Sequence, residues 1–160
     1  MADSQGIYEK EDYDPFLKEG SDWTWFKKIL GLCIVDGKPG HFLDIGAGLG
    51  FFVECCSRFD IKCTGIEGSQ FGAAKAKERE VNVIHFKIDK TPLPFATESI
   101  STVLMSEFIE HVPKKIAMFI LRESYRVLEK KGVIIILTPS RYNPRENKDP
   151  KHINLYSKKT

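Results

Sequence analysis

Apolar and polar positions follow two different periods along the chain, and from residue 41 onward the two periods alternate regularly. Short apolar runs typical of β-strands occupy 41–46, 61–67, 81–88, 99–106 and 132–140. Segments with apolar residues at helical spacing lie between them, at 49–59, 69–80 and 114–131. Strands that alternate with helices in this way predict an α/β fold, a doubly wound and mainly parallel sheet with helices on both faces.

The two ends of the chain have a different pattern. Residues 1–38 form a polar segment that ends in a helical stretch, with Trp23, Phe26, Ile29 and Leu30 on one face. Residues 141–160 are polar and loop-like. We therefore expect a single domain, with an N-terminal helical or lid segment at 1–38, a core at 39–140 and a substrate-side loop or tail at 141–160.

Composition excludes several classes of protein. No apolar run approaches the roughly 20 residues that a membrane span needs, and the polar, acidic N-terminus is unlike a secretory signal. The four cysteines form no CxxC pair, so neither a zinc site nor a disulfide framework is indicated. We expect a cytoplasmic protein.

Charge is distributed unevenly although the net charge is only +2. Residues 1–20 carry six acids and two bases, whereas 141–160 carry six bases and two acids. The basic tail contains two aromatic residues, Tyr142 and Tyr156, but not the repeated aromatic or glycine–arginine interleaving that accompanies nucleic-acid binding. We therefore interpret it as a solvated tail and do not expect a nucleic-acid partner.

Three glycines mark the point where the first predicted strand turns into the first core helix. They are Gly46, Gly48 and Gly50, in the stretch "HFLDIGAGLGFF". Glycine allows a tight turn and a close approach of the backbone to a ligand, and ligands of such sheets bind beyond the carboxyl ends of the strands. The dinucleotide-binding fingerprint needs a third glycine where Phe51 stands, so an NAD pattern fails at its last element.

The stretch "LDIGAGLG" resembles the first motif of the class I S-adenosylmethionine-dependent methyltransferases, which have a Rossmann-like fold, and in particular those of type 11/12. Further stretches resemble later motifs of that family in the same order: "TGIEGS", "FKIDKTPLPF", "SEFIEHVP" and "YRVLEKKGVIIILTP". The resemblance covers roughly residues 40–160. It departs at the end, because family members usually continue with another helix and two more strands, for which this sequence has no matching segment.

The resemblance implies S-adenosylmethionine as cofactor, with S-adenosylhomocysteine as product. Asp44 would hold the cofactor's ammonium group, Glu67 its ribose and Asp89 the adenine amine, and Ser106 would face the sulfonium. The implied cofactor-binding residues are Asp44, Gly46, Ala47, Gly48, Gly50, Glu67, Gly68, Ile88, Asp89 and Ser106.

The stretch "SEFIEHVP" also resembles the two-glutamate, one-histidine metal site of certain O-methyltransferases. Glu107, Glu110 and His111 would be the ligands, with His152 as a fourth candidate. Acids at this position also favour the N-terminus of the helix that follows, so we predict no metal. No catalytic residue is assigned, and His111 is the one candidate for a general base.

The sequence therefore predicts a methyltransferase that acts on a small-molecule, lipid or glycan acceptor. Two alternatives stay open: an NAD(P)-binding oxidoreductase, and a non-catalytic cofactor-binding or regulatory module. The uninterrupted apolar run from Val133 to Leu137 would form an exposed edge of the sheet. We expect that edge to be covered, either by a second copy in a homodimer, by further residues or by the tail.

Overall fold

The computed structural model describes residues 8, 10–19, 23–140, 142 and 151–157. Residues 1–7 and most of the basic tail lie outside the described residues. The helices are α1 (Lys10–Glu19), α2 (Trp23–Asp36), α3 (Phe51–Ser57), α4 (Gln70–Glu78) and α5 (Lys114–Val127), with a short 3₁₀ helix η1 (Ile109–His111). The strands are β1 (Phe42–Ile45), β2 (Cys63–Glu67), β3 (Val83–His85), β4 (Ile100–Ser106) and β5 (Leu128–Leu137).

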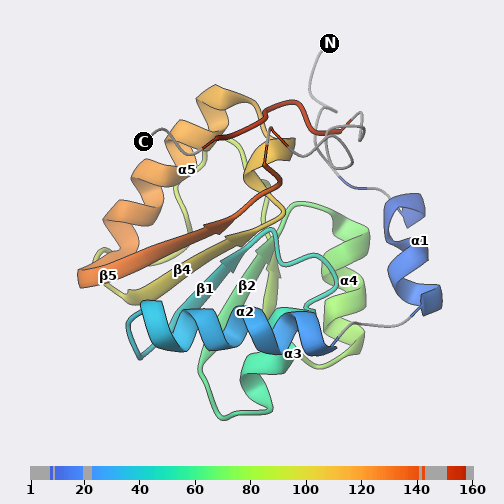
Figure 1. The fold of residues 1–160 in the computed structure, drawn as a ribbon, viewed down its shortest axis with the longest axis horizontal. Coiled ribbons are helices and arrows are strands. Elements are labelled where there is room, and N and C mark those ends of the chain that lie inside the picture. The colour runs from blue at the N-terminus through green and yellow to red at the C-terminus, as the bar shows by residue number, and fades with distance from the viewer. Residues whose placement is uncertain (1–7, 9, 20–22, 141, 143–150, 158–160) are drawn as a thin grey trace.

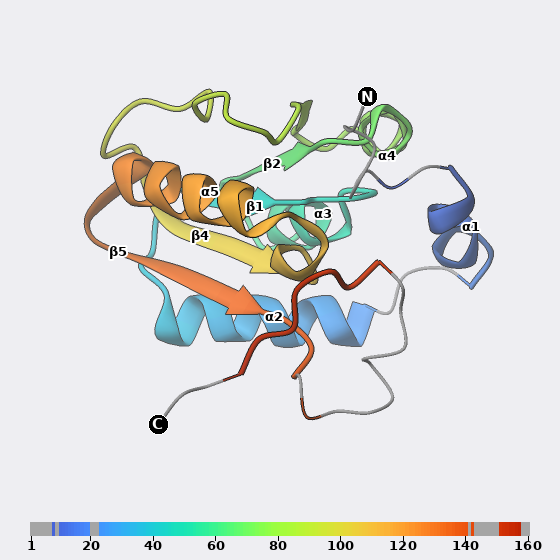
Figure 2. The same cartoon turned by 90° about the horizontal axis from the view of Figure 1, so that it is seen from above.

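The strands form one parallel sheet in the order β3-β2-β1-β4-β5. Helices α2 and α3 cover one face of the sheet and α5 covers the other (Figures 1 and 2). The predicted doubly wound architecture is therefore confirmed. The central strand β1 lies between β2 and β4, and the chain leaves β1 toward α3 on one side and reaches β4 on the other.

Strand β1 shows why this sequence forms a central strand. All four of its residues are buried, so neither face of the strand is exposed to solvent. Leu43 and Ile45 join the apolar cluster under α5, whereas Phe42 joins the cluster under α2 and α3. Asp44 shares the face of Phe42, because side chains alternate along a strand. The sequence thus places a carboxylate in the interior at the end of its central strand.

The boundary between α5 and β5 differs from the sequence prediction. We expected the helix to continue to residue 131 with Gly132 as its stop, but α5 ends at Val127 and Leu128 already has extended backbone. Leu128 pairs with Ile100, and the register then shifts before the next pair. Gly132 lies within this irregularity, where a Cβ would come within 2.8 Å of the Leu128 side chain. The glycine therefore serves packing inside a strand and does not end a helix.

The third strand is also shorter than the predicted strand at 81–88. Only Val83–His85 forms β3, and residues 86–99 run as a loop over the sheet face. Leu93 is buried in the α5-side cluster, and Phe86, Ile88 and Phe95 pack against it. Arg126 holds this loop through its guanidinium, which donates to the carbonyls of Leu93 and Phe95 at 3.0 and 2.9 Å.

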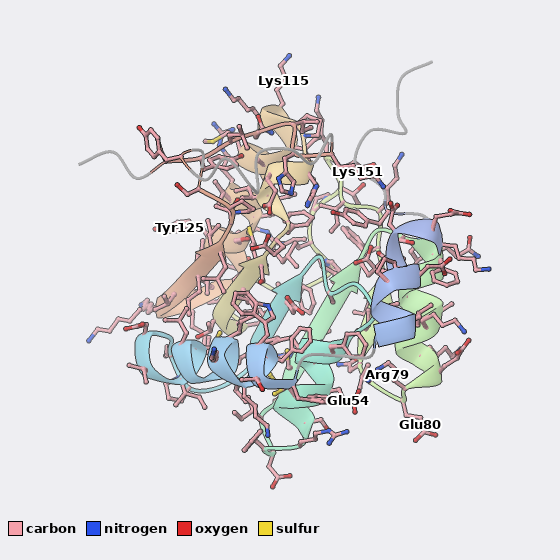
Figure 3. The ribbon with its side chains drawn as sticks, turned by 45° about the vertical axis from the view of Figure 1, so that its right-hand side comes forward. Glu54, Arg79, Glu80, Lys115, Tyr125 and Lys151 are labelled. Atoms are coloured by element: carbon pink, nitrogen blue, oxygen red, sulfur yellow. The ribbon has the colours of Figure 1, made fainter. Side chains whose placement is uncertain are left out.

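The N-terminal segment forms two helices. Helix α2 buries Ile29, Leu30 and Cys33 against the sheet, so its predicted apolar face is confirmed. Helix α1 is anchored by Tyr13, whose side chain is 6% exposed and contacts the ring of Phe71 at a centroid distance of 5.8 Å. Near α1, Arg79 at the end of α4 pairs with Glu54 of α3 (Figure 3).

The 151–156 segment returns to the body of the domain beside η1. The backbone N–H of Asn154 donates to the Glu110 carbonyl at 3.0 Å, and its side-chain amide donates to the carbonyl of Val112. Within the described residues the outer edge of β5 has no strand partner, and the tail contributes one isolated bridge, between Ser140 and Tyr156. Among those same residues no helix is long and apolar enough to cross a membrane.

Candidate functional site

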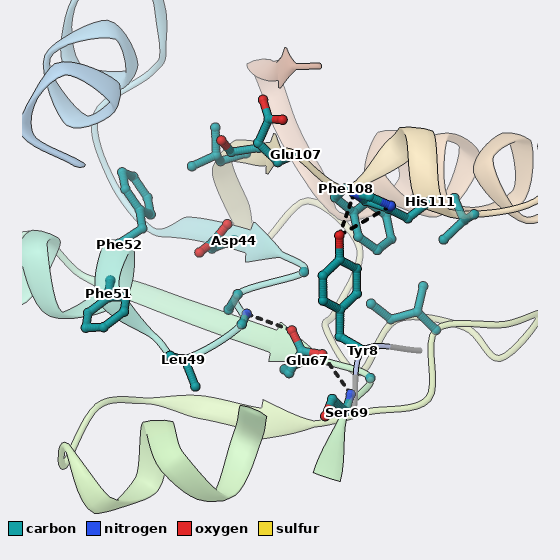
Figure 4. Close-up of a pocket in the computed structure, with 18 of the residues that line it drawn as sticks. Tyr8, Asp44, Leu49, Phe51, Phe52, Glu67, Ser69, Glu107, Phe108 and His111 are labelled. Carbon is teal, nitrogen blue, oxygen red and sulfur yellow. Dashed lines mark hydrogen bonds between the residues drawn. The ribbon is translucent and has the colours of Figure 1, made fainter. Parts of the chain in front are cut away.

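A cavity of about 420 Å³ lies beyond the carboxyl ends of β1, β2 and β4 (Figure 4). This is the switch point of the sheet, where the strand order reverses, and it is where ligands of open α/β sheets bind. The volume falls within the range of roughly 300–1,000 Å³ that is typical of small-molecule sites. The predicted cofactor residues that line it are Asp44, Gly46, Ala47, Gly48, Glu67, Gly68, Ile88, Asp89 and Ser106.

The glycine-rich turn after β1 forms one wall of the cavity. The backbone N–H groups of Gly46 and Ala47 donate to the Ile66 carbonyl at 2.9 and 3.0 Å, which ties the turn to β2. Gly46 has a φ of +83°, and a Cβ there would lie 2.5 Å from the ring of Phe108. Only glycine fits this position, because both the backbone angle and the available space exclude a side chain.

Glu67 joins the glycine-rich turn to the loop after β2. Its carboxylate accepts a hydrogen bond from the backbone N–H of Gly48 at 2.6 Å and another from that of Ser69 at 2.7 Å. Burial raises the pKa of Glu67, and these N–H donors act in the opposite direction. Tyr13 of α1 also lies against this carboxylate, and burial raises the pKa of its phenol. The acid thus holds the shape of the site as well as facing the cavity.

Asp44 is the most buried carboxylate that faces the cavity in the described part of the chain. Its side chain is 4% exposed, and burial raises its pKa to about 7, with the nearby charge of Glu67 adding to the effect. Among the described residues no ion pair includes Asp44. A buried carboxylate of this kind is stabilised in its charged form by a cationic ligand group.

Asp89 sits in a more open environment than the other two acids. One of its oxygens accepts hydrogen bonds from the backbone N–H and the hydroxyl of Thr91, both at 2.7 Å. These donors lower the pKa of Asp89. Its second oxygen lies 3.7 Å from the ammonium of Lys87. The side chain is therefore charged and fixed in a turn beside Ile88, at the rim of the cavity.

Gly50 is the one predicted cofactor residue that does not line the cavity. It caps α3, and a Cβ there would lie 2.7 Å from Val81 and 3.0 Å from Ala76. Its φ is +79°, and this conformation allows the start of α3 to pack closely against α4 and the turn between α4 and β3. The sequence spacing that suggested a ligand contact reflects this close packing.

Sequence reasoning missed most of the apolar lining. The missed part includes Trp25, Leu49, Phe51, Phe52, Leu104, Phe108, Val112, Pro113 and Ile116. The sequence predicted the apolar face of 23–30 and a helical or lid segment at 1–38, and Tyr13, Phe26 and Ile29 of that segment also line the cavity. Nothing in the pattern distinguishes a residue that packs on the sheet from one that also borders the cavity.

His111 lies at one side of the cavity in a network that joins both ends of the chain (Figure 4). Its Nδ1 lies 3.1 Å from the Lys151 carbonyl and its Nε2 lies 2.9 Å from the Tyr8 hydroxyl. The Lys151 ammonium pairs with Asp12 of α1 and lies 4.8 Å from the centre of the Tyr8 ring. The N-terminal segment and the 151–156 segment thus meet over η1.

The metal candidates are only partly brought together. Ligand atoms of Glu110, His111 and His152 lie within 4.8 Å of one another, and Glu107 is not part of this group. Nδ1 of His111 lies against the Lys151 carbonyl, and the Tyr8 hydroxyl lies 2.9 Å from Nε2 and 3.4 Å from Nδ1. The three side chains are close enough to hold a metal ion, and the expectation that the protein needs no metal stays a prediction.

Comparison with known proteins identifies relatives of this architecture. A family described as "Methyltransferase domain" matches residues 43–136. A methyltransferase from Archaeoglobus fulgidus, described as dependent on S-adenosylmethionine, superposes with a TM-score of 0.77 at 20% identity. It covers 92% of this chain, which spans 68% of that protein. None of the curated proteins compared matches the sequence.

Two further solved structures add detail about their own ligands. A Thermotoga maritima methyltransferase, described as a possible histamine N-methyltransferase, has a TM-score of 0.55 and 28% identity, over 78% of this chain and 58% of that one. A methyltransferase from Bacteroides fragilis was crystallised with S-adenosylhomocysteine. It has a TM-score of 0.54 and 20% identity, over 68% of this chain and 44% of that one.

Proposed function

The chain belongs to the family of methyltransferase domains and has the fold of their S-adenosylmethionine-dependent members, and from that premise we propose that it transfers a methyl group from S-adenosylmethionine to a small-molecule, lipid or glycan acceptor. The observation that carries this proposal is the pairing of two buried acids in one cavity. Asp44 faces the cavity with no cationic partner among the described residues, and Glu67 borders it at the end of the neighbouring strand.

Each predicted residue has a role that its surroundings support. Asp44 holds the cofactor's ammonium group, which supplies a positive charge beside this buried carboxylate. Glu67 accepts from the ribose hydroxyls with the lone pairs that Gly48 and Ser69 leave over. Asp89 accepts from the exocyclic amine of adenine at the rim, and Ser106 at the end of β4 faces the sulfonium.

S-adenosylmethionine supplies an already activated methyl group when it is bound. The chain itself has to orient the acceptor, exclude water and accept a proton where the acceptor loses one. The apolar walls of the cavity, with Phe26, Phe52 and Leu104, serve the first two tasks. His111, which borders the same cavity, is our candidate for the third.

The test of this function is a binding experiment with the intact chain. We expect S-adenosylhomocysteine to raise the melting temperature, because it binds the folded state alone, and we expect NAD to leave it unchanged. Native mass spectrometry of the freshly purified protein checks for co-purified cofactor. The matched control is Tyr125→Phe, a substitution on the exposed side of α5 that leaves the cavity intact.

The alternatives predict different results. Stabilisation by NAD, with no response to S-adenosylhomocysteine, would support an oxidoreductase. Cofactor binding without turnover of any acceptor would support a regulatory module. A reducing, cytoplasmic location remains our expectation, and it is consistent with Cys33, Cys55, Cys56 and Cys63, which are all free thiols. The homodimer through the outer edge of β5 also remains a proposal.

A further inference from the structure

We propose that Tyr13 of α1 is a positioning residue, which fixes the carboxylate of Glu67 toward the ribose hydroxyls and thereby couples the docking of α1 to cofactor binding. This inference rests on the proposed methyltransferase function and adds to it a residue outside the glycine-rich turn and the strand ends. It is carried by the burial of Tyr13 and by the groups that surround its phenol ring.

Tyr13 anchors α1 on the domain. Helix α1 lies beside α4 (Figure 1), and of its side chains that the structure describes only that of Tyr13 is buried. The ring of Tyr13 contacts those of Tyr8 and Phe71, at centroid distances of 5.9 and 5.8 Å. The same side chain lines the cavity. The buried residue that anchors α1 therefore also borders the candidate cofactor site.

Two glycines leave the space that Tyr13 occupies. A Cβ at Gly72, in the first turn of α4, would lie 2.8 Å from the Tyr13 hydroxyl oxygen and 3.2 Å from Cγ of Glu67. A Cβ at Gly48 would lie 3.7 Å from Cε1 of the Tyr13 ring. A glycine inside a helix costs stability relative to alanine, so Gly72 indicates a packing need at this contact. The phenol is thus enclosed between the glycine-rich turn and the start of α4, with the Glu67 side chain beside it.

The phenol of Tyr13 is a donor beside an acceptor. Burial, and next the charge of Glu67, raise the pKa of the phenol, so it keeps its proton. Burial raises the pKa of Glu67, and the donors around it, Tyr13 among them, act in the opposite direction. The backbone N–H groups of Gly48 and Ser69 each hold one oxygen of this carboxylate, at 2.6 and 2.7 Å (Figure 4). Tyr13 adds a donor from a third segment of the chain, which restrains the rotation of the carboxylate.

This arrangement couples two events at one carboxylate. The ribose hydroxyls and the Tyr13 phenol all donate to Glu67, so each bond forms best when the carboxylate has one fixed orientation. Docking of α1 supplies that orientation in advance, which lowers the ordering cost of cofactor binding. By thermodynamic reciprocity, the bound cofactor stabilises docked α1 by the same factor. Helix α1 is thus a cover whose closure the cofactor itself promotes.

The first experiment removes the phenol hydroxyl alone. Calorimetry measures the affinity of the full chain for S-adenosylhomocysteine and for its dideoxy analogue, which lacks both ribose hydroxyls. Tyr13→Phe should weaken binding of S-adenosylhomocysteine about fivefold, the scale of one hydrogen bond, and leave the affinity for the analogue unchanged. Loss of the packing of α1 would weaken both ligands equally, so the ratio of the two affinities separates positioning from structure. Tyr125→Phe, on the exposed face of α5, is the matched control and should behave as the parent.

The second experiment perturbs the same contact from α4 and follows hydrogen exchange. In the parent, S-adenosylhomocysteine should slow the exchange of the α1 amides more than the dideoxy analogue does. Gly72→Ala keeps the tyrosine and adds the Cβ that would meet its hydroxyl. This variant should lower both the protection of α1 and the affinity for S-adenosylhomocysteine, although alanine favours a helix. Gly31→Ala in α2 is the matched control, because within the described part of the chain nothing besides its neighbours in α2 lies within 4 Å of the added Cβ.

Three results would each overturn the inference. They are an unchanged affinity for S-adenosylhomocysteine in Tyr13→Phe, an equal loss of affinity for both ligands, and exchange of the α1 amides that S-adenosylhomocysteine does not alter. Any of them in a parent that binds S-adenosylhomocysteine would refute the role of Tyr13 and leave the methyltransferase function standing. A parent that binds neither ligand would count against the methyltransferase function itself, and this inference would fall with it.

Discussion

Asp44 offers the sharpest test of the site, because the structure gives both its burial and the direction of its titration. The perturbation is Asp44→Asn, which keeps the size of the side chain and removes its charge at every pH. Burial raises the pKa of Asp44 from 3.8 to about 7 in the folded protein. The folded state therefore binds more protons than the unfolded state between these two values, and stability falls as pH rises through this window.

The size of the effect follows from the width of the window. One pKa unit corresponds to about 1.4 kcal/mol, so the shift of about 3 units implies a cost of about 4 kcal/mol when Asp44 is fully ionised. About 1.5 kcal/mol of that cost is already present at pH 5. Between pH 5 and pH 8 the parent should thus lose about 3 kcal/mol that the Asp44→Asn variant does not lose.

The assay is urea denaturation of the two proteins at pH 5 and pH 8, without cofactor, followed by circular dichroism. The difference between the two free energies of unfolding reports the ionisation of Asp44 together with its repulsion of Glu67, because the other titrating groups are present in both proteins. The same pair should differ in cofactor binding. The parent should bind S-adenosylhomocysteine about tenfold more tightly at pH 8 than at pH 6, since only the ionised carboxylate holds the ammonium. The Asp44→Asn variant should bind weakly at both.

A constant difference in unfolding free energy between pH 5 and pH 8 would refute the reasoning. It would mean that Asp44 ionises in the folded protein as easily as in water. The carboxylate would then be neither desolvated nor in need of a cationic ligand group. The ammonium contact would then lose its physical basis, even if the cofactor binds elsewhere in the cavity.

The remaining predictions concern other parts of the site and the sheet. Gly46→Ala should destabilise the fold by about 2 kcal/mol or more by chemical denaturation, because of its positive φ and the contact with Phe108. Glu67→Ala should weaken S-adenosylhomocysteine binding by calorimetry, since it also leaves the N–H groups of Gly48 and Ser69 without acceptors; an unchanged affinity would count against the ribose assignment. Chelators should leave cofactor binding unaffected, whereas a divalent ion bound by Glu110 and His111 would contradict our expectation. Light scattering should show a dimer if the outer edge of β5 pairs with a second copy, and a monomer would exclude that pairing.

The sequence predicted those parts of the molecule that depend on local pattern. The buried run ending in Asp44 and the alternation of strands and helices defined the sheet, because burial on both faces leaves a recognisable apolar run. Gly46 and Gly48 line the cavity and Gly50 does not, and their contact with a cofactor stays a prediction. The positive φ of Gly50 accompanies close packing against Val81 and Ala76, which a sequence cannot distinguish from a ligand contact.

The rest of the site depends on contacts between segments that are distant in the sequence. The end of α5 at Val127 was missed because Leu128 is drawn into the sheet by its pairing with Ile100, a tertiary effect that overrides helix propensity. The hydrogen bond between Tyr8 and His111 joins residues 103 positions apart. No local spacing carries such a pair, so the sequence could suggest His111 as a base without showing what lies against it.

The contact between Lys151 and Asp12 spans 139 positions of the chain, and this separation has a thermodynamic consequence. The folded sheet already brings the two segments near each other, so the contact costs mainly the ordering of α1 and of residues 151–157, and the exposed ion pair and partly buried rings return little free energy. The cover over the cavity therefore opens more easily than the sheet beneath it unfolds. In native-state hydrogen exchange the amides of α1 should lose their protection while those of β1 and β4 retain theirs. Ligands would then enter the cavity when α1 and the 151–156 segment open, while β1 and β4 stay folded.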